Sequence, residues 1–206
     1  MTTTATRDVK TRRTQEERRA ETERRLLEAA LRIIARSGSR SMTVAEVGRE
    51  AGYSRGIVSH QFGSRHELLS KAAVHAQNAV GYIDDGSAGL EALLQLVTLY
   101  LTDAAKNEEV RRAFLIMWVE AVADEPSLRP IYAERDTWFR RLLADSMGHG
   151  IADGTIRTDI DPQAMAVVML GQLRGIKLQQ MLTPDAAPPH LVRREALAMI
   201  RRALTV

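Results

Sequence analysis

Apolar residues recur at helical spacing along most of the chain, and this pattern predicts an all-α fold of about nine helices. In the first of them, Leu26, Leu27, Ala30, Ile33 and Ile34 fall on one side of a single helix. Runs that alternate apolar and polar residues between hairpin turns, as strands do, are weak throughout. We therefore expect helices packed on helices, with no sheet.

Capping residues set the expected beginnings of these helices. The capping-box form Ser/Thr-x-x-Glu begins at Thr14, Thr43 and Ser64, and Ser54 offers a further N-cap. Three helix starts within about twenty residues are a dense signal, because globular helices average about 11–12 residues. The predicted helices lie within 14–37, 43–51, 54–62, 64–82, 90–106, 110–123, 127–147 and 161–181, with a last one after Pro189 up to 204.

Glycines set two of the expected ends. Gly38 is suited to a left-handed C-cap on the first helix. Gly148, Gly150 and Gly154 predict a glycine-rich turn after the helix that begins near 127.

The most informative segment is 43–62, TVAEVGREAGYSRGIVSHQF, in which two short helices meet at Gly52. Gly52 provides the left-handed conformation that a sharp turn requires, and Gly48 lets the two helices cross closely. This is the spacing of a helix-turn-helix, whose second helix is sized for the major groove of DNA. The residues expected to pack between the two helices are Val44, Val47, Val58 and Phe62.

Polar residues on the second short helix predict contacts with DNA. Arg55 lies in its first turn, and arginine can bond to guanine O6 and N7. Gly56 costs the helix about 1 kcal/mol relative to alanine, which close approach to a duplex would explain. Helix N-termini at Thr43 and Ser64 suit phosphate. The predicted DNA-contacting residues are Arg40, Thr43, Tyr53, Ser54, Arg55, Gly56, Ile57, Ser59, His60, Ser64 and Arg65.

An alternative for this segment is a helical hairpin inside a bundle, in which Arg55 is simply exposed to solvent. Ile57 can contact a thymine methyl or belong to the core, and Gln61 can face either way. The coincidence of capping box, glycine turn, capped short helix and basic flank favours DNA binding.

Charge is distributed unevenly over the 206 residues. Residues 1–65 hold 14 Lys/Arg and 8 Asp/Glu, whereas residues 66–206 hold 15 and 18. A basic N-terminal third suggests a polyanion partner, although charge alone is better explained by a solvated helix face. Residues 1–13 are polar and basic, and we expect a disordered arm that adds salt-dependent attraction to DNA.

Composition and motifs limit the cellular compartments and the kinds of chemistry that we expect for this chain. The chain has no cysteine, no apolar stretch near the ~18 residues of a membrane span, and no apolar signal region over residues 1–8. We expect a cytoplasmic protein with no membrane partner. The five histidines lack metal-ligand spacing, and nucleotide-binding and nucleophile motifs are absent. No metal, cofactor or catalytic residue is predicted, and the alternative function is a helical-bundle enzyme or an interaction module without DNA binding.

Residues 22–70 resemble the DNA-binding domain of the TetR family of regulators, through ETERRLLEAALRIIARSG and TVAEVGREAGYSRGIVSHQFGSRHELL. The positions that match the family pattern are Ala51, Gly52, Ser54, Gly56, Phe62, Ser64 and Leu68. The chain departs from it at Ser59, usually Tyr, at Gln61, often aromatic, and at Arg65, usually Lys. The missing Tyr removes a phosphate- or sugar-contacting ring, a role that His60 can take.

This resemblance implies three regions: an arm over 1–13, a three-helix DNA-binding domain over 14–66 with its helix-turn-helix at 43–62, and an effector-binding and dimerisation body over 67–206. It implies a ligand-responsive repressor that binds a palindromic operator as a homodimer. A ligand in the body would reorient the helix that begins at Ser64. This would move the second helix of the helix-turn-helix, over 54–62, in each protomer.

Six of the nine aromatic residues lie between 100 and 139, with methionines nearby. Their simplest role is the hydrophobic core, but the family resemblance implies a pocket for a small apolar or amphipathic effector. The predicted pocket residues are Tyr100, Phe114, Met117, Trp118, Glu120, Trp138, Met165 and Met169.

The last two helices are expected to form the dimer interface. Gly171 and Gly175 lie one turn apart and allow a partner helix to approach, and the family resemblance implies a four-helix bundle between protomers. The alternative is packing of the same helices within one chain. The predicted interface residues are Ala164, Val168, Gly171, Gln172, Gly175, Leu197, Ile200 and Leu204.

Overall fold

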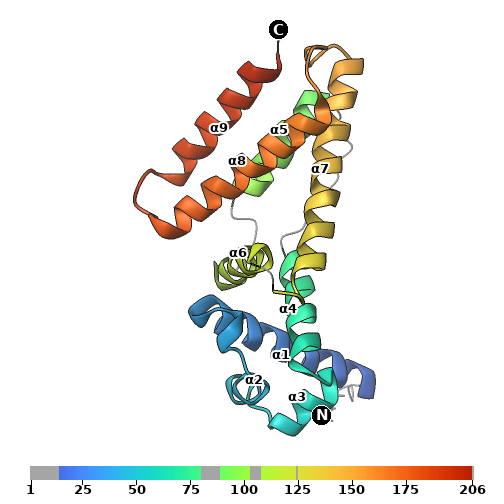
Figure 1. The fold of residues 1–206 in the computed structure, drawn as a ribbon, viewed down its shortest axis with the longest axis vertical. Coiled ribbons are helices and arrows are strands. Elements are labelled where there is room, and N and C mark those ends of the chain that lie inside the picture. The colour runs from blue at the N-terminus through green and yellow to red at the C-terminus, as the bar shows by residue number, and fades with distance from the viewer. Residues whose placement is uncertain (1–13, 80–88, 103–107, 124, 206) are drawn as a thin grey trace, which may run out of the picture.

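The computed structural model describes residues 14–79, 89–102, 108–123 and 125–205, and every regular element in these ranges is helical (Figure 1). The lower part of the molecule in Figure 1 contains α1 (Gln15–Ser37), the 3-10 helix η1 (Ser39–Ser41), α2 (Val44–Ala51), α3 (Arg55–Phe62) and α4 (Arg65–Ala79). The remainder is built from α5 (Gly89–Leu101), α6 (Glu108–Val122), α7 (Arg129–Ala152), α8 (Pro162–Leu182) and α9 (Pro189–Leu204). These nine α-helices, counted over the described ranges, confirm the predicted fold class.

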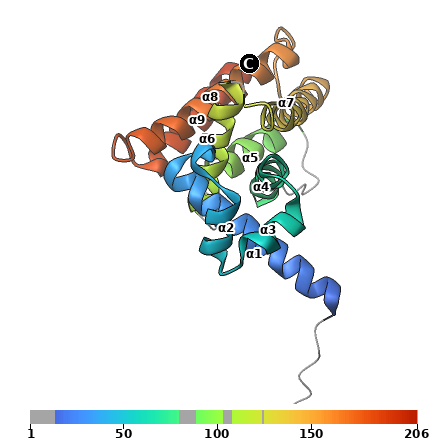
Figure 2. The ribbon, with the colours of Figure 1, turned by 60° about the horizontal axis from the view of Figure 1, so that its bottom comes forward.

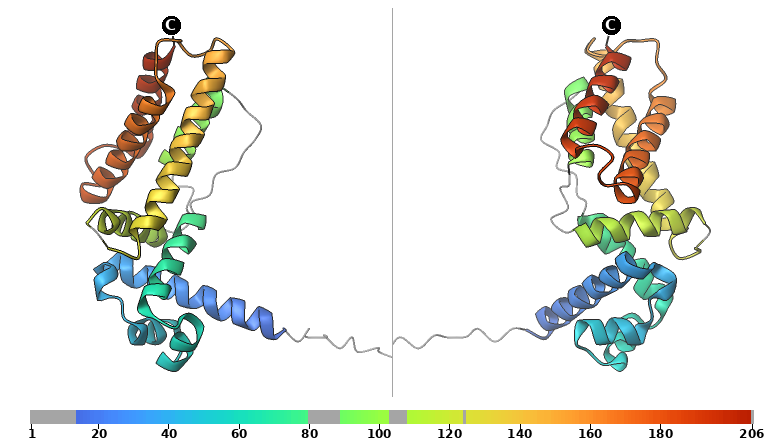
Figure 3. Two further views of the ribbon diagram at one scale, coloured as in Figure 1. Left: turned by 45° about the vertical axis from the view of Figure 1, so that its right-hand side comes forward. Right: turned by 90° about the vertical axis from the view of Figure 1, so that its left-hand side faces the viewer.

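Among the residues that the structure describes, buried side chains form two clusters. The lower cluster joins α1–α4 to α6, and it includes Val58 of α3, Leu68 of α4 and Phe114 of α6. The upper cluster packs α5, α7, α8 and α9 together. In Figure 3, α6 lies across the molecule between α1 and the upper helices. The DNA-binding domain expected from the sequence therefore shares its core with α6, and the boundary expected after residue 66 falls inside α4.

Several expected caps are present. Thr14 and Glu17 form a complete capping box, with Glu17 N–H donating to Thr14 Oγ1 at 3.1 Å and Thr14 N–H to Glu17 Oε2 at 2.8 Å. Gly38 has a positive φ of 78°, but its ψ of 165° is not the left-handed helical value that the sequence predicted. The chain instead leaves α1 in an extended direction toward η1.

The prediction of a glycine-rich turn over 148–154 is wrong for its first two glycines. α7 continues through Gly148 and Gly150, and only Gly154 has a positive φ. A Cβ at Gly150 would lie 2.5 Å from Ile156 Cδ1, so this glycine serves close packing of the following turn on the helix.

Most helix ends fall within a few residues of expectation. α5 ends at Leu101, earlier than expected, and α6 begins at Glu108. The expected ends at Tyr82 and Lys106 lie outside the described residues. Among the described helices, none combines the length and the apolar character needed to cross a membrane.

Candidate nucleic-acid interface

Helix α3 presents a polar face to solvent. Val58 and Phe62 are buried in the lower cluster, whereas Arg55, Ser59 and His60 are exposed. The helix lies at the lower end of the molecule in Figure 1, on the side away from α8 and α9, and it is likewise remote from these two helices in the turned view of Figure 2. An exposed short helix with arginine in its first turn has the geometry of a major-groove reader.

The structure shows the positions of two side chains, Ile57 and Gln61, whose orientation the sequence did not determine. Ile57 is 43% exposed and does not belong to the core. Gln61 turns toward α1, where its Nε2 donates to Glu23 Oε2 at 2.8 Å. Gln61 therefore positions α3 against α1.

The turn between α2 and α3 depends on two glycines. Gly52 takes the left-handed conformation, with φ 76° and ψ 27°. A Cβ on Gly48 would lie 2.8 Å from the Tyr53 carbonyl oxygen, closer than real Cβ atoms approach. The Ser54 hydroxyl caps α3 by accepting from Ile57 N–H at 3.4 Å. The predicted helix-turn-helix is thus present and closely packed.

Carboxylates of α1 and α2 form the polar contacts that join α2, α3 and α4 to α1. Glu23 also accepts from Lys71 Nζ of α4 at 3.1 Å, so it links α3 and α4 to α1. Glu50 of α2 accepts from Arg36 Nη2 at 2.9 Å and from Arg32 Nε at 3.0 Å. These bonds, with Arg36 the larger contributor, lower the pKa of Glu50.

The predicted phosphate-contacting residues differ in their availability. Arg40, Thr43 and Ser64 are exposed. Arg65 is half-buried, and its guanidinium donates to the carbonyl oxygens of Ser39 and Met42 at 2.5 and 3.0 Å. Arg65 therefore ties the start of α4 to η1, and its charge is directed inward.

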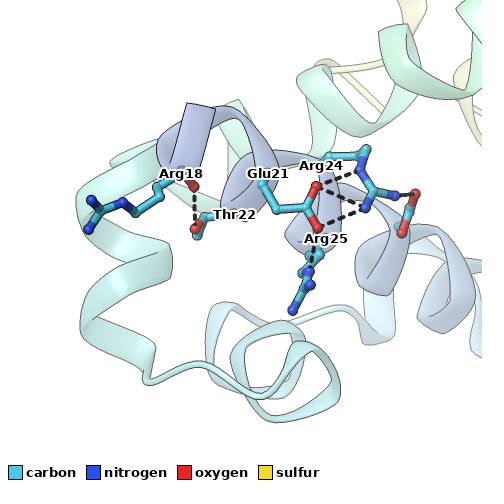
Figure 4. Close-up of polar contacts among 6 residues, drawn as sticks. Arg18, Glu21, Thr22, Arg24 and Arg25 are labelled. Atoms are coloured by element: carbon cyan, nitrogen blue, oxygen red, sulfur yellow. Dashed lines mark hydrogen bonds and ion pairs between the residues drawn. The ribbon is translucent and has the colours of Figure 1, made fainter. Parts of the chain in front are cut away.

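Part of the basic character of the N-terminal third is neutralised on α1 (Figure 4). The Glu21 carboxylate lies between Arg24 and Arg25, at 2.9 Å from Arg24 Nη2 and 2.7 Å from Arg25 Nε. These hydrogen bonds, that from Arg25 first, lower the pKa of Glu21. Arg24 also pairs with Glu28 at 2.5 Å. This stretch of charge is a solvated, ion-paired helix face, as the alternative interpretation of composition held.

Three of the eight predicted pocket residues converge on a buried arginine. The guanidinium of Arg174, on α8, lies 5.7, 5.0 and 5.3 Å from the ring centroids of Tyr100, Phe114 and Trp118. Its Nη2 pairs with Asp136 Oδ1 of α7 at 2.6 Å, and Trp118 Nε1 donates to the other oxygen at 3.0 Å. Arg174 is 4% exposed.

The other five predicted pocket residues lie elsewhere. Met117 is part of the lower core, and Met165 and Met169 pack with the upper cluster. Trp138 is 42% exposed and stacks against the Arg135 guanidinium. Glu120 accepts a hydrogen bond from Ser39 N–H and thereby contacts η1.

The sequence interpretation missed Arg174 and Asp136. A signal was available, since Arg174 and Lys177 are the only charged residues in the otherwise apolar and amide-bearing α8, and both are buried. Basic residues are seldom buried without a partner. Lys177 Nζ donates a hydrogen bond to the Leu101 carbonyl oxygen at 3.1 Å, and Arg174 forms an ion pair with Asp136.

The predicted interface residues divide into two groups. Ala164, Val168 and Gly171 are exposed on α8, with Val168 63% exposed. Ile200 and Leu204 are buried in the chain's own upper cluster, so their side chains are taken up by intrachain packing, as the alternative held. The remaining three, partly exposed, are Gln172, Gly175 and Leu197.

Comparison with known proteins covers both parts of the chain. Residues 26–72 match the family model of bacterial regulatory proteins of the tetR family, and residues 89–205 match the C-terminal region of BetI-type transcriptional repressors. The regulator BetI of Agrobacterium fabrum is 32% identical over 53% of this chain and 57% of its own length. The regulator SrpR of Pseudomonas putida is 21% identical over 80% of this chain and 78% of its own. The chain thus spans under two thirds of the matched BetI relative.

Solved structures share the fold. A transcriptional regulator from Saccharomonospora viridis, crystallised with choline, superposes with a TM-score of 0.77 at 22% identity, covering 91% of this chain and 99% of that one. A TetR-family regulator from Rhodococcus sp. gives 0.70 at 26% identity, covering 88% and 97%. Because the BetI-type model alone matches more than half of the residues, the chain belongs to the TetR family of transcriptional regulators.

Proposed function

We propose that this chain is a DNA-binding repressor that acts as a homodimer on a palindromic operator and responds to a small molecule bound in its body. The observation that carries the proposal is the exposed polar face of α3, which is anchored to the lower cluster by the buried Val58 and Phe62. A reading helix must be both solvent-facing and fixed in orientation for its side chains to meet base edges.

Within this proposal, Arg55 reads a base edge, and Ser59 and His60 lie one turn further along the exposed helix. Phosphate contacts come from the exposed N-termini at Thr43 and Ser64 and from Arg40. Tyr53, Ser54, Gly56 and Ile57 complete the predicted contact set at the turn and the first turn of α3. We assign Arg65 a positioning role, because its guanidinium is bonded to η1.

A second copy of the chain is the expected cover for the exposed apolar side chains of α8 and α9. Val167, Val168 and Met199 are 58, 63 and 47% exposed, which is unusual for large apolar residues so close together on two helices. Gln172 Nε2 lies 3.8 Å from Met199 Sδ, so the two helices are side by side there. A two-fold dimer through this surface would present two α3 helices to two half-sites.

Helix α6 supplies a physical route from body to DNA-binding domain. Phe114 and Trp118 of α6 face Arg174, while Arg112 and Glu120 of the same helix bond to α1 and η1. A ligand beside Arg174 that shifts α6 must therefore strain or move the end of α1. The regulator from Saccharomonospora viridis binds choline, which supports a small-molecule site in the body of this chain as well.

The proposal is tested by selecting bound sequences from random DNA with the purified full-length protein, followed by gel shifts at several salt concentrations. We expect a palindromic consensus and an affinity that falls steeply with salt. Absence of DNA binding at low salt would sink the proposal. The relatives named above are regulators, which decides against the alternative of a helical-bundle enzyme.

A further inference from the structure

The buried guanidinium of Arg174 has unused hydrogen-bond donors. Within the described part of the chain, its Nε and Nη1 find no hydrogen-bond partner, and neither does the buried hydroxyl of Tyr132. Arg174 is 4% and Tyr132 2% exposed. A buried donor without an acceptor is costly, so such groups in a native fold indicate an absent partner.

The chemistry of these atoms specifies what that partner offers. Arginine nitrogens only donate, whereas a tyrosine hydroxyl donates one hydrogen bond and can also accept. Burial raises the pKa of Tyr132, so its proton is retained. The described region has two other unsatisfied buried side-chain atoms, Ser39 Oγ and Glu120 Oε2, and neither is hydrogen-bonded to Arg174 or Tyr132. Two guanidinium nitrogens of Arg174, which can only donate, and the Tyr132 hydroxyl are thus left without a hydrogen-bond partner among the described residues.

Charged groups of both signs surround the unsatisfied donors. Asp136 is bonded through both oxygens, to Arg174 and to Trp118. Arg135 is half-buried, and burial together with the positive charge of Arg174 lowers its pKa. Glu120 also acts on Tyr132, but its Oε1 is bonded to Ser39 N–H. The neighbourhood therefore holds two arginines and two carboxylates, and Asp136 leaves Nε and Nη1 of Arg174 without an acceptor.

A cationic ligand fits this arrangement poorly. Quaternary ammonium ions are recognised by the faces of aromatic rings. Here the rings of Tyr100, Phe114 and Trp118 already surround the guanidinium of Arg174. A choline-like cation would have to displace Arg174 from Asp136, and it would bring no acceptor for the unused donors.

We infer that the effector of this chain is a carboxylate-bearing small molecule, whose carboxylate accepts hydrogen bonds from Arg174 and Tyr132. A carboxylate accepts charge-assisted hydrogen bonds from a guanidinium N–H, and Nε and Nη1 of Arg174 are free to donate them. This inference rests on the proposed function, since it names the ligand class of the effector site proposed there.

The test compares ligands of equal shape and opposite charge. The full-length protein carrying Trp138→Phe keeps Trp118 as its sole tryptophan, so its fluorescence reports on the ring beside Arg174. Phenylbutyrate, phenylbutylamine and choline are titrated in parallel, with calorimetry as a second readout. We expect phenylbutyrate to bind and to change Trp118 emission, and the two cations to do neither.

Variants then assign the binding to Arg174. The double variant Arg174→Gln/Asp136→Asn removes both charges together and so leaves no buried charge unpaired. It should weaken phenylbutyrate binding by roughly tenfold or more, whereas Arg174→Lys should retain part of it. Arg141→Gln, an exposed arginine of α7, is the matched control and should bind as the parent does.

Gel shifts on the same preparations separate this inference from the proposed function. Tighter binding of phenylbutylamine or choline than of phenylbutyrate overturns the inference. So does failure to bind phenylbutyrate by a preparation that binds its operator, and then the proposed repressor function stands. Equal phenylbutyrate affinity in the double variant and the parent also overturns it. A preparation that binds carboxylate but no DNA supports the ligand class and contradicts the repressor.

Discussion

The Glu120 carboxylate accepts a hydrogen bond from the backbone N–H of Ser39 at 3.0 Å, across 81 residues of sequence. Two turns earlier on α6, Arg112 Nε donates to the Ala35 carbonyl at 2.8 Å. Ala35 lies in the last turn of α1, where carbonyl groups lack partners within the helix. Helix α6 therefore completes the C-terminal end of α1, and the two helices move together or break these bonds.

Glu120→Ala is expected to loosen this joint. A hydrogen bond to a charged group contributes about 1.5–3 kcal/mol, so thermal unfolding should show a loss of stability in that range. The effector should also release the operator less effectively, because the hydrogen bond that joins α6 to η1 is lost. Glu120→Gln keeps an acceptor oxygen and should restore most of both properties. If Glu120→Ala unfolds and responds as the parent does, Glu120 does not couple the two parts.

Glycine substitutions separate packing from DNA approach. At Gly48 a Cβ would meet the Tyr53 carbonyl at 2.8 Å, so Gly48→Ala should destabilise the fold by about 1–3 kcal/mol. At Gly56 the nearest atom is Ser54 Oγ at 3.7 Å, so Gly56→Ala should raise stability by up to ~1 kcal/mol. If the α3 backbone lies close to DNA, Gly56→Ala also weakens operator binding. Unfolding midpoints and gel shifts measure both effects, and unchanged DNA affinity in Gly56→Ala would contradict close approach.

Local signals explain why the helix-turn-helix was predictable. Ser54, Gly52 and Thr43 act through residues two to four positions away, so their sequence context carries the structure. Gly150 was misinterpreted because glycine predicts a turn from local propensity alone. Its actual constraint is Ile156, which returns to pack on the helix after the chain has turned at Gly154.

The buried arginine site was not predictable by the same means. Arg174 pairs with Asp136, 38 residues away, and its rings come from α5 and α6. Only the folded arrangement brings these residues together. Aromatic clustering along the sequence identified Tyr100, Phe114 and Trp118, but it equally selected Trp138, which lies at the surface. The aromatic content of the sequence indicated the region of the site, but only the tertiary packing determines which aromatic residues surround Arg174.

Two arginines should separate base reading from phosphate attraction. Arg55→Ala is expected to cost about 1–3 kcal/mol on the preferred operator and to relax specificity at one base position. Arg40→Ala should weaken binding nearly equally on all sequences and reduce the salt slope by about one. Both residues are exposed, so neither change should alter folding. Equal losses on specific and random DNA for Arg55→Ala would make Arg55 a phosphate contact.

Glu50 should make the DNA-binding domain more stable at neutral than at acidic pH. Arg36 and Arg32 lower its pKa in the folded state, so its stabilisation is complete above about pH 5 and is lost as the pH falls through the lowered value. Glu50→Gln should therefore reduce stability at pH 7 by about 0.5–1 kcal/mol, a small amount because the pair is partly exposed. The deficit should shrink in acid, measured by denaturant unfolding from pH 7 to 3. Glu134→Gln, at an exposed position of α7, is the control. A deficit that stays constant with pH would show that the Glu50 charge is not its source.

Val168→Glu is expected to separate the proposed homodimer. Val168 is 63% exposed on α8, beside Val167, and a glutamate there would place two like charges within a two-fold interface without partners. Light scattering should then report a monomer, and operator affinity should fall, because two half-sites are no longer held by one particle. Val122→Glu, at a 70% exposed position of α6, adds the same charge outside α8 and α9 and should remain dimeric. A Val168→Glu variant that stays dimeric with full operator affinity would exclude this surface of α8 from the interface, and the dimer would then have to form through other residues.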